Sequence, residues 1–491
     1  MDEVEVLVVG AGPTGLVMAA QLAAAGARTR VVDRALDRAR ESRALGIQPR
    51  TLEVLAALGV TDELVAAGNQ AVQLRLHAHG RERVVPLFDL GLPDTAYPYL
   101  LFLSQAETER VLGERLAALG PQVERGVELV ALDRAGAGVV ATLRHRDGRQ
   151  EQVSARYVVG CDGAHSTVRH LTGIGFEGGS YPQTFVLADL EADGPASGAA
   201  HVFLAGRGML LLFPLGHPAS WRLLAMRPPA DPTPPDAPVT LGEVQALADT
   251  YTGATVRLHD PVWTTNFRLH HRVATRYRAG PVFLAGDAAH IHSPAGAQGM
   301  NTGIQDAVNL GWKLAHTLRA DADPALLDSY EIERAPVGRL VLRFTDRAFT
   351  VATSTNPLVR FARTRVAPAL IPVVLGSRRV RAAAFRAVSQ LGITYRRSPL
   401  SVDGPGGPRN GPRAGDRLPD APLPGDPGSA TLHQLTATPG WHLLLYGPPA
   451  AWPAAATAVL DRYPLTAHRL GAPAGPAGPP DPAGPALRRL G

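Results

Sequence analysis

Cysteine and lysine are almost absent from this chain of 491 residues. Cys161 is the only cysteine, so the chain can form no internal disulfide, no zinc site with several cysteines and no Cys-x-x-Cys redox pair. Lys313 is the only lysine among 49 basic residues, and arginine supplies the rest. The scarcity of cysteine is typical of an intracellular protein, and we expect a cytoplasmic one.

Long hydrophobic runs are also missing. The longest apolar runs, such as residues 209–215, are far shorter than the roughly 18 residues that a membrane-spanning helix needs. The first residues enter an apolar run at once, without the basic stretch and cleavage site of a secretory signal. We therefore expect no membrane partner. Apolar residues make up 45% and charged residues 19% of the chain, which is ordinary for a globular protein, and its length predicts two or three domains.

The formal net charge of +5 has a local source. Residues 340–397 contain 11 arginines and one acid, Asp346, whereas the rest of the chain carries 38 basic and 43 acidic groups. This segment is interrupted by proline and does not alternate arginine with base-stacking aromatic residues, so we expect no nucleic-acid partner. We expect its arginines to lie on solvated helix faces or to pair with acids of neighbouring domains. Steering of an anionic ligand toward the protein is the alternative.

The first 35 residues predict a strand, a helix over residues 13–25 and a second strand over residues 27–33. Their largely apolar strands are typical of a parallel sheet covered on both faces. Asp33 ends the second strand, where an acid can accept hydrogen bonds from the ribose hydroxyls of NAD or FAD. Glycines in the turn would allow a sharp bend, close approach of the backbone to a pyrophosphate and close packing of the helix on the strand. The turn reads Gly10-Ala11-Gly12-Pro13-Thr14-Gly15.

Apolar patterns and turn signals divide the chain into four segments. Residues 1–174 predict a nucleotide-binding domain with small β insertions, and residues 175–270 predict a separate domain of longer strands. Residues 271–399 return to the first domain through a buried strand and a helix, and then continue as a helical segment. Residues 400–491 are rich in proline; a strand at residues 441–446 predicts a small terminal domain, followed by a disordered tail.

Two later segments, each placed after a predicted strand, resemble the DG and GD motifs of the flavoprotein aromatic hydroxylases. The first runs from Cys161-Asp162-Gly163 to Arg169. The second is Gly286-Asp287, followed by the loop Pro294-Ala-Gly-Ala-Gln-Gly299-Met300-Asn301. All three motifs occur in the order and spacing of that family, and the arginine-bearing segment at residues 41–53 and Gln105 match as well. The resemblance is close over residues 3–340 and looser toward the C-terminus.

The resemblance implies an α/β fold: a Rossmann-like FAD-binding domain, an inserted β-sheet-rich substrate domain and a small C-terminal thioredoxin-like domain. The size of the chain and its C-terminal tail resemble those of the branch that hydroxylates aromatic polyketides in bacterial antibiotic biosynthesis. The family implies non-covalent FAD, NADPH as a transient co-substrate, and O2, with oxygen transferred through a flavin C4a-hydroperoxide. The expected cofactor-binding residues are Gly10, Gly12, Pro13, Thr14, Gly15, Asp33, Arg34, Arg43, Gln105, Asp162, Asp287, Pro294, Gly299, Met300 and Asn301.

Several of these residues have a physical role to test. Asp287 is placed to accept hydrogen bonds from ribityl hydroxyls, or else to cap a helix. The helix that starts near Met300 would direct backbone N–H groups at the flavin pyrimidine edge and stabilise the reduced, anionic ring. Gln105 and Arg43 would hold ribityl and phosphate groups, or else lie on a helix surface. Arg50 is the catalytic candidate, near a phenolate or the peroxide, with a helix-surface arginine as the alternative.

Other polar residues admit two interpretations. In the family, Asp162 and Arg169 connect the flavin region to the approach of the pyridine nucleotide; a salt-bridged turn is the alternative. His290 and His292 form a His-x-His pair, but too few further ligands lie nearby for a metal site, and we expect none. Cys161 is expected to be a small buried hydrophobe rather than a nucleophile.

A second Gly-x-Gly-x-x-Gly between a strand and a helix is missing. This favours a single-component hydroxylase that meets NADPH transiently, and such an enzyme would be a monomer or a homodimer. The middle domain would bind a small polycyclic aromatic substrate, although aromatic residues on strands are more often core. Those aromatic residues are Phe203, Phe213, Trp221, Trp263 and Phe267.

Two alternatives to aromatic hydroxylation remain open. A Baeyer-Villiger or epoxidising monooxygenase would share the same motifs, and a flavin-binding protein without catalysis would need only the cofactor residues. One departure from the family loop is Ala297, which stands where a second glycine is usual and is expected to stiffen the loop slightly.

Overall fold

The computed structural model describes most of the chain: residues 2–38, 44–71, 73–78, 80–85, 92–205, 208–228, 234, 237–293, 296–319, 322–354, 356–404, 411–423, 430–446, 458–460, 462–463, 465–470 and 490. Arg43 and Pro294, two of the expected cofactor residues, lie outside this part. Within the part described, no helix has the length and apolar character needed to cross a bilayer.

The first sheet is centred on β1 (Asp2–Val9), which pairs in parallel with β2 (Thr29–Asp33) and with β11 (Gln150–Gly160). Two further parallel strands, β8 (Val123–Arg125) and β18 (Val282–Leu284), extend it on either side. The antiparallel strands β9 (Val127–Ala135) and β10 (Gly138–His145) continue from β11, and β17 (Arg278–Ala279) completes an edge. The predicted parallel sheet, including the late strand near residue 282, is confirmed.

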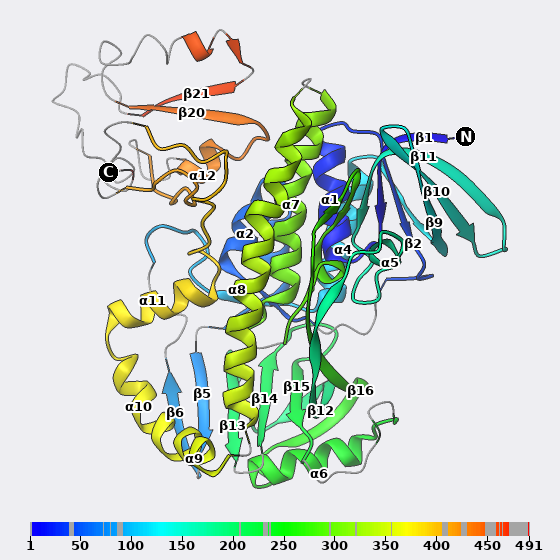
Figure 1. Cartoon of the computed structure of the whole chain (residues 1–491). Helices are drawn as coiled ribbons and strands as arrows, with labels where there is room; N and C mark the ends of the chain where they lie inside the picture. The colour runs from blue at the N-terminus through cyan, green and yellow to red at the C-terminus, as the bar shows by residue number, and fades with distance from the viewer. Residues whose placement is uncertain are drawn as a thin grey trace, which may run out of the picture.

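Helices cover this sheet and connect it to the rest of the molecule (Figure 1). Pro13 begins α1 (Pro13–Ala24) because its fixed φ suits the first helical position and its missing N–H costs no hydrogen bond there. α1 packs against α4 (Gln105–Ala118) and α7 (Gly299–Arg319). The remaining helices near this sheet are α2 (Pro49–Ala56), α3 (Thr61–Ala67), α5 (Thr167–Leu171) and the 26-residue α8 (Asp328–Thr353).

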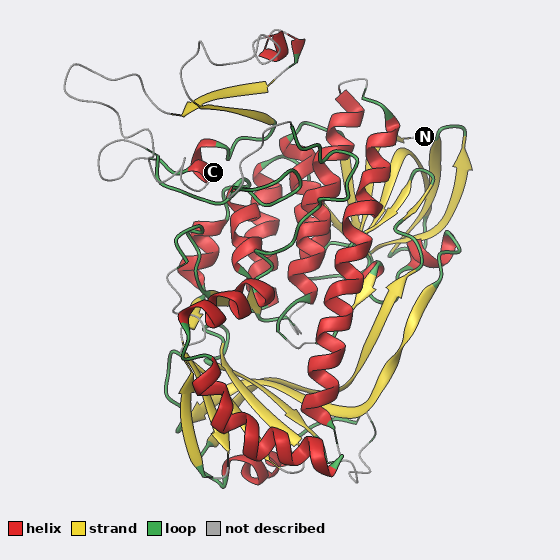
Figure 2. Ribbon diagram, turned by 60° about the vertical axis from the view of Figure 1, so that its left-hand side comes forward, coloured by secondary structure: helices red, strands yellow, loops and turns green. Residues whose placement is uncertain are grey.

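A second, mostly antiparallel sheet lies at the other end of α8 (Figure 2). Its strand order is β19-β16-β12-β15-β14-β13-β5-β6. The strands are β5 (Gln73–Ala78), β6 (Arg81–Val85), β12 (Phe176–Asp193), β13 (Ala199–Ala205), β14 (Gly208–Pro214), β15 (Trp221–Met226), β16 (Arg257–Ala274) and β19 (His290–Ile291). The sheet therefore recruits strands from outside the predicted range 175–270. α6 (Leu241–Thr252) covers one of its faces.

A small third sheet, β3-β7-β4, joins the segments before α2 and α4. Its strands are β3 (Gly46–Ile47), β4 (Asn69–Ala71) and β7 (Leu100–Phe102). The predicted helical segment after α8 consists of α9 (Pro357–Phe361), a π-helical turn (Ala362–Val366), α10 (Ala367–Val374) and α11 (Arg378–Val388).

The C-terminal part contains the predicted strand as β20 (Trp441–Tyr446), which pairs in parallel with β21 (Leu465–Leu470). The short helix α12 (Leu432–Leu435) precedes the pair. The Trp441 ring packs edge-on against the Trp312 ring of α7, with 5.5 Å between ring centroids. The strand at residues 441–446 is confirmed, and the thioredoxin-like topology stays a prediction because much of this part lies outside the described residues.

Candidate active site

The turn between β1 and α1 is so tight that two of its glycines cannot carry a side chain. Gly10 has φ +101°, and a Cβ atom there would lie 2.4 Å from the carbonyl oxygen of Cys161. A Cβ atom on Gly15 would lie 1.9 Å from the carbonyl oxygen of Gly10. At Gly12, by contrast, a Cβ atom would meet only Glu109 Oε1, at 4.0 Å. The protein's own packing therefore does not require Gly12, which suits a backbone position left open for a ligand.

The N-terminus of α1 is ready to receive an anion. Gly12 is its N-cap residue and supplies no side-chain hydrogen bond, and the first turn holds no acidic residue. The first N–H groups of a helix have no partner within the helix, and the helix dipole places partial positive charge there. A pyrophosphate would satisfy both features.

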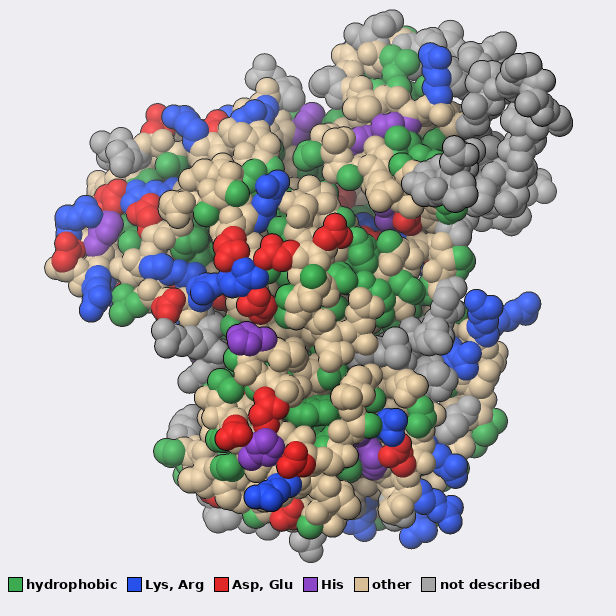
Figure 3. Space-filling model, turned by 180° about the vertical axis from the view of Figure 1, so that it is seen from behind, with side chains coloured by type: hydrophobic (Ala, Val, Ile, Leu, Met, Phe, Trp, Pro, Cys, Tyr) green, Lys and Arg blue, Asp and Glu red, His purple; other side chains and the backbone are tan. Residues whose placement is uncertain are grey.

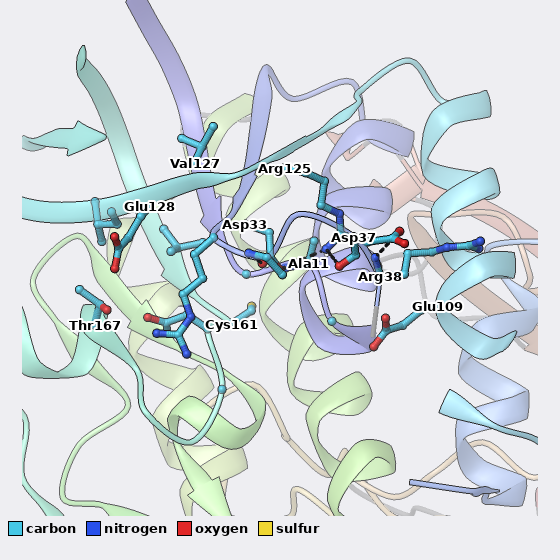
Figure 4. A pocket seen from close by; sticks show the side chains of 18 of the residues that line it. Ala11, Asp33, Asp37, Arg38, Glu109, Arg125, Val127, Glu128, Cys161 and Thr167 are labelled. Atoms are coloured by element: carbon cyan, nitrogen blue, oxygen red, sulfur yellow. Dashed lines mark hydrogen bonds and ion pairs between the residues drawn. The ribbon is translucent and has the colours of Figure 1, made fainter. Parts of the chain in front are cut away.

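A cavity of about 440 Å³ opens in front of this turn. Six predicted cofactor residues line it together: Gly10, Gly12, Asp33, Arg34, Gln105 and Asp162. The prediction missed other polar or charged residues of the lining, namely Asp37, Arg38, Glu109, Arg125, Glu128 and Thr167. Figure 4 shows Asp33 beside Ala11 and Arg125, with Glu109 approaching from α4. No local motif marks the missed residues, because they come from separate strands, helices and loops that only the folded domain brings together.

Asp33 is held rigidly at the end of β2. Its Oδ2 accepts a hydrogen bond from the backbone N–H of Ala11 at 2.6 Å, and its Oδ1 accepts one from Ala35 at 2.7 Å. Arg125 Nη1 lies 3.6 Å from Asp33 Oδ2. The carboxylate is thus fixed at the mouth of the glycine turn, beside the exposed Arg34, where the prediction places the ribose.

Asp162 offers an acceptor to the same cavity. Its Oδ2 accepts a hydrogen bond from the N–H of Val168 at 3.1 Å, whereas its buried Oδ1 has no hydrogen-bond partner among the described residues. A buried carboxylate oxygen without a donor is costly, so this atom fits the hydroxyl group of a bound cofactor. The adjacent Cys161 is buried, and burial raises the pKa of its thiol well above the usual range, which disfavours a nucleophilic role.

Arg169 joins the DG and GD segments rather than facing the cavity. Its Nη1 donates to the carbonyl of Ala288 and its Nη2 to the carbonyl of Ala164, both at 2.9 Å. The guanidinium lies 3.8 Å from the centroid of the Phe176 ring, and the residue is 3% exposed. These contacts favour the structural interpretation of Arg169.

Thr14 is the point where the glycine motif, the GD motif and α7 meet. A Cβ atom on Gly286 would lie 2.6 Å from Thr14 Oγ1, and one on Gly303 would lie 2.4 Å from the same oxygen. The GD motif forms a 3-10 turn (Gly286–Ala288) in which Asp287 is exposed, and Ala285, not Asp287, is the N-cap residue. The ribityl role of Asp287 stays a prediction.

Asn301 fixes the loop before α7, the predicted flavin-ring loop. Its Nδ2 donates to the carbonyls of Gly46 and Ala297, both at 2.7 Å, and its Oδ1 accepts from the N–H of Gln48 at 2.8 Å. Gln48 Nε2 in turn donates to the carbonyl of Gly296 at 2.7 Å. Asn301 is fully buried, and these hydrogen bonds shape the loop, so its role toward the cofactor stays a prediction. α7 begins at Gly299, as predicted within one residue, and Met300 is half-buried.

A buried ion network that no sequence motif indicates connects α7 to the GD motif. Asp306 accepts from Arg334 Nε at 2.7 Å, from His290 Nε2 at 2.6 Å and from the N–H of Gly286 at 3.1 Å. All three side chains, Asp306, Arg334 and His290, are 0% exposed. Burial alone would raise the pKa of Asp306, but His290 and Arg334 hold it below its usual range. His290 is therefore a partner of this carboxylate.

The only lysine is part of a second buried network on α7. Lys313 Nζ donates to Glu333 Oε2 at 2.7 Å and to Asn309 Oδ1 at 2.9 Å. Ser398 Oγ donates to Glu333 Oε1 at 2.7 Å. Burial lowers the pKa of Lys313 to about 8 despite the charge of Glu333. A lone lysine among 48 arginines was a signal that could have identified this position.

Arg50, the catalytic candidate, lies at the start of α2 and is 30% exposed. Its Nη1 donates to Glu53 Oε2 at 3.0 Å. It does not line the 440 Å³ cavity. A catalytic role for Arg50 therefore stays a prediction.

The second sheet separates the five candidate aromatic residues onto two faces. Phe203 and Trp221 pack in the core beneath α6, together with Leu210 and Leu212. Phe213, Trp263 and Phe267 lie in other clusters, with Phe349 of α8 or with Phe102 of β7. On this opposite face of β14 the side chains of Met209, Leu211 and Phe213 are only partly buried, whereas the intervening Leu210 and Leu212 are fully buried.

One ion pair interrupts this apolar face. Arg222 donates from Nε and Nη2 to the two carboxylate oxygens of Asp189, each at 2.6 Å, and Trp263 Nε1 donates to Asp189 Oδ2 at 2.8 Å. Arg222 Nη1 reaches the carbonyl of Ala44, before β3, at 2.9 Å. The face with Leu211 and Phe213 is thus turned toward the segment that leads into α2.

The glycine turn, the end of β2 and the DG segment line one cavity, and Thr14 connects the glycine turn to the GD motif and to α7. The second sheet offers a separate apolar face. This arrangement defines a flavoprotein of the aromatic hydroxylase fold. A model of the FAD binding domain family matches residues 3–345, and the chain belongs to this family.

Comparisons with known proteins agree. The 6-methylpretetramide 4-monooxygenase of Streptomyces rimosus is 39% identical over 457 residues, covering 91% of this chain and 80% of that protein. Among solved structures, the OxyS anhydrotetracycline hydroxylase from Streptomyces rimosus superposes with a TM-score of 0.76 at 34% identity, covering 95% of this chain and 90% of that chain. CabE, an aromatic hydroxylase from angucycline biosynthesis, superposes with a TM-score of 0.75 at 31% identity, covering 98% of this chain and 92% of that chain.

The chain is therefore an FAD-dependent monooxygenase. Bound FAD would supply the redox chemistry with NADPH and O2, and the protein would supply position, charge and exclusion of water. The residues present fit the cofactor: the uncapped α1 N-terminus suits the pyrophosphate, and Asp162 Oδ1 suits a hydroxyl group.

Proposed function

We propose that this chain hydroxylates a polycyclic aromatic polyketide or a related polycyclic phenol, with NADPH and O2 as co-substrates. The observation that carries the proposal is the partly exposed apolar face of the second sheet, formed by Met209, Leu211 and Phe213. A flat ring system can bury a large apolar area on such a wall, at about 25 cal/mol per Å². The names of the relatives support the same substrate class.

The protein's contribution to the reaction is positional. The sheet face would hold the ring system, and α8 with Phe349 would close one side against water. Ion-paired Asp189 and Arg222 would fix the sheet against the segment before β3 and keep the distance between substrate and cofactor constant. The predicted residues Arg34, Arg43, Gln105, Asp287 and Pro294 would complete the cofactor site.

The proposal is tested by purifying the full chain and supplying polycyclic phenols. The protein should be yellow and release FAD on denaturation. With NADPH and a probe such as anhydrotetracycline, NADPH oxidation should accelerate, and mass spectrometry should find a product heavier by one oxygen with its rings intact.

Other outcomes would replace the proposal. A product in which a ring has expanded to a lactone would indicate a Baeyer-Villiger monooxygenase. A yellow protein whose NADPH oxidation no polycyclic phenol accelerates would indicate a flavin-binding protein of another function.

A further inference from the structure

An ion cluster ties the C-terminal segment at residues 411–423 to α2. Arg417 Nε donates to Glu53 Oε2 at 2.7 Å, and Arg417 Nη2 donates to Glu53 Oε1 at 2.5 Å. The side chain of Glu53 is 1% exposed and that of Arg417 is 5% exposed. Such a bidentate, buried pair has the geometry of a strong charge-assisted contact.

Asp94 extends the cluster and fixes the segment. Arg417 Nη1 lies 3.1 Å from Asp94 Oδ2, and Arg417 Nη2 also donates to the Asp94 carbonyl. Arg386 of α11 donates to both carboxylate oxygens of Asp94, at 2.6 and 2.8 Å. The backbone N–H of Asp420 donates to the Asp94 carbonyl at 3.0 Å. Asp94, itself held by Arg386 and by the backbone of Asp420, therefore holds the guanidinium of Arg417 on Glu53.

Arg50 shares Glu53 with Arg417, but unequally. Arg50 reaches only Oε2, at 3.0 Å, from a side chain that is 30% exposed, whereas Arg417 occupies both oxygens. Burial would raise the pKa of Glu53, but the hydrogen bond from Arg417 and the charge of Arg50 hold it below its usual range. Glu53 is thus a buried carboxylate that requires a counter-ion. Without Arg417, Arg50 would be the arginine left on Glu53.

The start of α2 is directly connected to the flavin loop. Gln48, the N-cap residue of α2, binds the carbonyl of Gly296 with its side chain and the side chain of Asn301 with its backbone N–H. The charge of Arg50, two residues after Gln48, therefore lies at the end of α2 that abuts this loop.

We propose that Arg417 is a positioning residue that the C-terminal segment contributes to the flavin site. By neutralising Glu53, it leaves the guanidinium of Arg50 able to turn toward an anionic group on the flavin ring or on the substrate. The substrate half of this inference rests on the proposed function, whereas the flavin half needs only bound FAD.

The test compares five full-length, FAD-loaded proteins: wild type, Arg417→Met, Arg417→Lys, the double variant Glu53→Gln/Arg417→Met, and Arg396→Met. Sulfite, which adds reversibly to the flavin ring as an anion and bleaches its absorbance, reports local charge without any turnover. Anhydrotetracycline serves as the substrate probe. Arg396 is the matched control because it pairs with Asp416 in the same segment but is 51% exposed.

Arg417→Met should weaken sulfite binding and raise the KM for the probe by about three-fold to five-fold each, the effect of withdrawing one partly exposed charge. The double variant should return both values to within two-fold of wild type, because a neutral glutamine cannot hold Arg50 as carboxylate does. Arg396→Met should match wild type, and Arg417→Lys should fall between wild type and Arg417→Met.

If the Arg417–Glu53 contact serves only to attach the C-terminal segment, the sulfite affinities and KM values should differ from this pattern. In that case the double variant, which also lacks this contact, would bind sulfite and the probe as weakly as Arg417→Met. That result, or an unchanged sulfite affinity in an Arg417→Met protein that retains FAD, would overturn the inference. Failure of wild type to oxidise NADPH with any probe would contradict the proposed function instead, and the sulfite comparison would still decide the role of Arg417.

Discussion

Gly15 shows at the scale of one residue how closely the backbone of the cofactor turn is packed. Because a Cβ atom would lie 1.9 Å from the carbonyl oxygen of Gly10, Gly15→Ala should lower the free energy of unfolding by about 3 kcal/mol or more and reduce FAD retention at least ten-fold. Gly113→Ala is the control, since no atom lies within 4 Å of its Cβ position on α4, and it should stabilise by up to about 1 kcal/mol. Urea unfolding and the flavin-to-protein absorbance ratio measure both effects; full FAD retention by Gly15→Ala would contradict this view of the turn.

Ala297 adopts a backbone conformation that L residues rarely adopt, with φ +54°. From the sequence alone, Ala297 is expected only to stiffen the loop slightly. The left-handed conformation of a residue with a Cβ costs about 1 kcal/mol, so Ala297→Gly should raise the free energy of unfolding by about 0.5–1 kcal/mol. Ala35→Gly, in the turn after β2, is the control and should not stabilise. Destabilisation by Ala297→Gly in urea unfolding would show that the left-handed backbone is not strained.

His292 predicts how stability depends on pH. Burial, aided by His290, lowers the pKa of His292 to about 3, and neither ring nitrogen has a hydrogen-bond partner among the described residues. Below pH 6.5 the unfolded chain binds a proton at this residue, whereas the folded chain does not until about pH 3, so the free energy of unfolding falls as the pH drops across this window. At pH 5 the loss from this one group is about 2 kcal/mol.

The variant His292→Phe should remove that part of the acid sensitivity. Urea unfolding at pH 7.5 and pH 5 should show a decrease in wild type that is about 2 kcal/mol larger than in the variant. His170→Gln, at an exposed position of α5, serves as the control. Equal decreases in wild type and His292→Phe would refute the assignment.

Residue roles were predictable from the sequence where a local motif dictates geometry, as at Gly10 and Gly15. They were not predictable where a role depends on partners far along the chain. Arg169 binds the carbonyl of Ala288, 119 residues away, and Asp306 is enclosed by Arg334 and His290. No spacing in the sequence indicates such contacts.

At the scale of secondary-structure elements, β14 has one face for the core and one for the proposed substrate. Leu210 and Leu211 are adjacent leucines that lie on opposite faces of β14. Leu210 is fully buried beneath α6, whereas Leu211 on the other face is only partly buried. Leu211→Ala should change the KM for a polycyclic phenol several-fold with little loss of stability. Leu210→Ala should cost about 2–4 kcal/mol of the free energy of unfolding and leave the KM of the folded enzyme unchanged. Steady-state kinetics and urea unfolding separate the two; the reverse pattern would place the substrate elsewhere.

Elements with a strong local pattern were predicted well, including α1, α7 and the strands β1, β2 and β18 of the first sheet. The sequence analysis missed β5 and β6, which join the second sheet through a parallel pairing of β5 with β13. Both strands are short and carry charged residues, and β13, the partner that joins β5 to the sheet, lies more than 100 residues away. The small β insertion expected within residues 1–174 is present as the antiparallel strands β9 and β10, whereas β8 pairs in parallel with β2.

The arginine-rich segment at residues 340–397 behaves partly as expected. Arg386 pairs with Asp94 and Arg396 with Asp416, so acids elsewhere in the chain neutralise part of its charge. Arg363 is instead held by backbone carbonyls at the end of α8, including that of Val351 at 3.2 Å. These contacts support structural pairing as the role of at least part of the segment.

At the scale of the whole molecule, α8 connects the cofactor and substrate regions. Its Tyr330 donates to the carbonyl of Leu284 in the first sheet, and its Phe349 packs on the second sheet. On the face seen in Figure 3, basic and acidic side chains are interspersed over much of the surface, and basic ones gather toward the lower right edge.

The central claim is that this molecule transfers an oxygen atom from O2 to a polycyclic aromatic ring. The most direct test supplies the purified, FAD-loaded protein with NADPH, a polycyclic phenol and ¹⁸O2, and measures the mass of the product. If the chain hydroxylates the ring, the product should carry one ¹⁸O atom and retain an intact ring system. A product without ¹⁸O, or NADPH oxidation that yields only hydrogen peroxide with every phenol supplied, would contradict it.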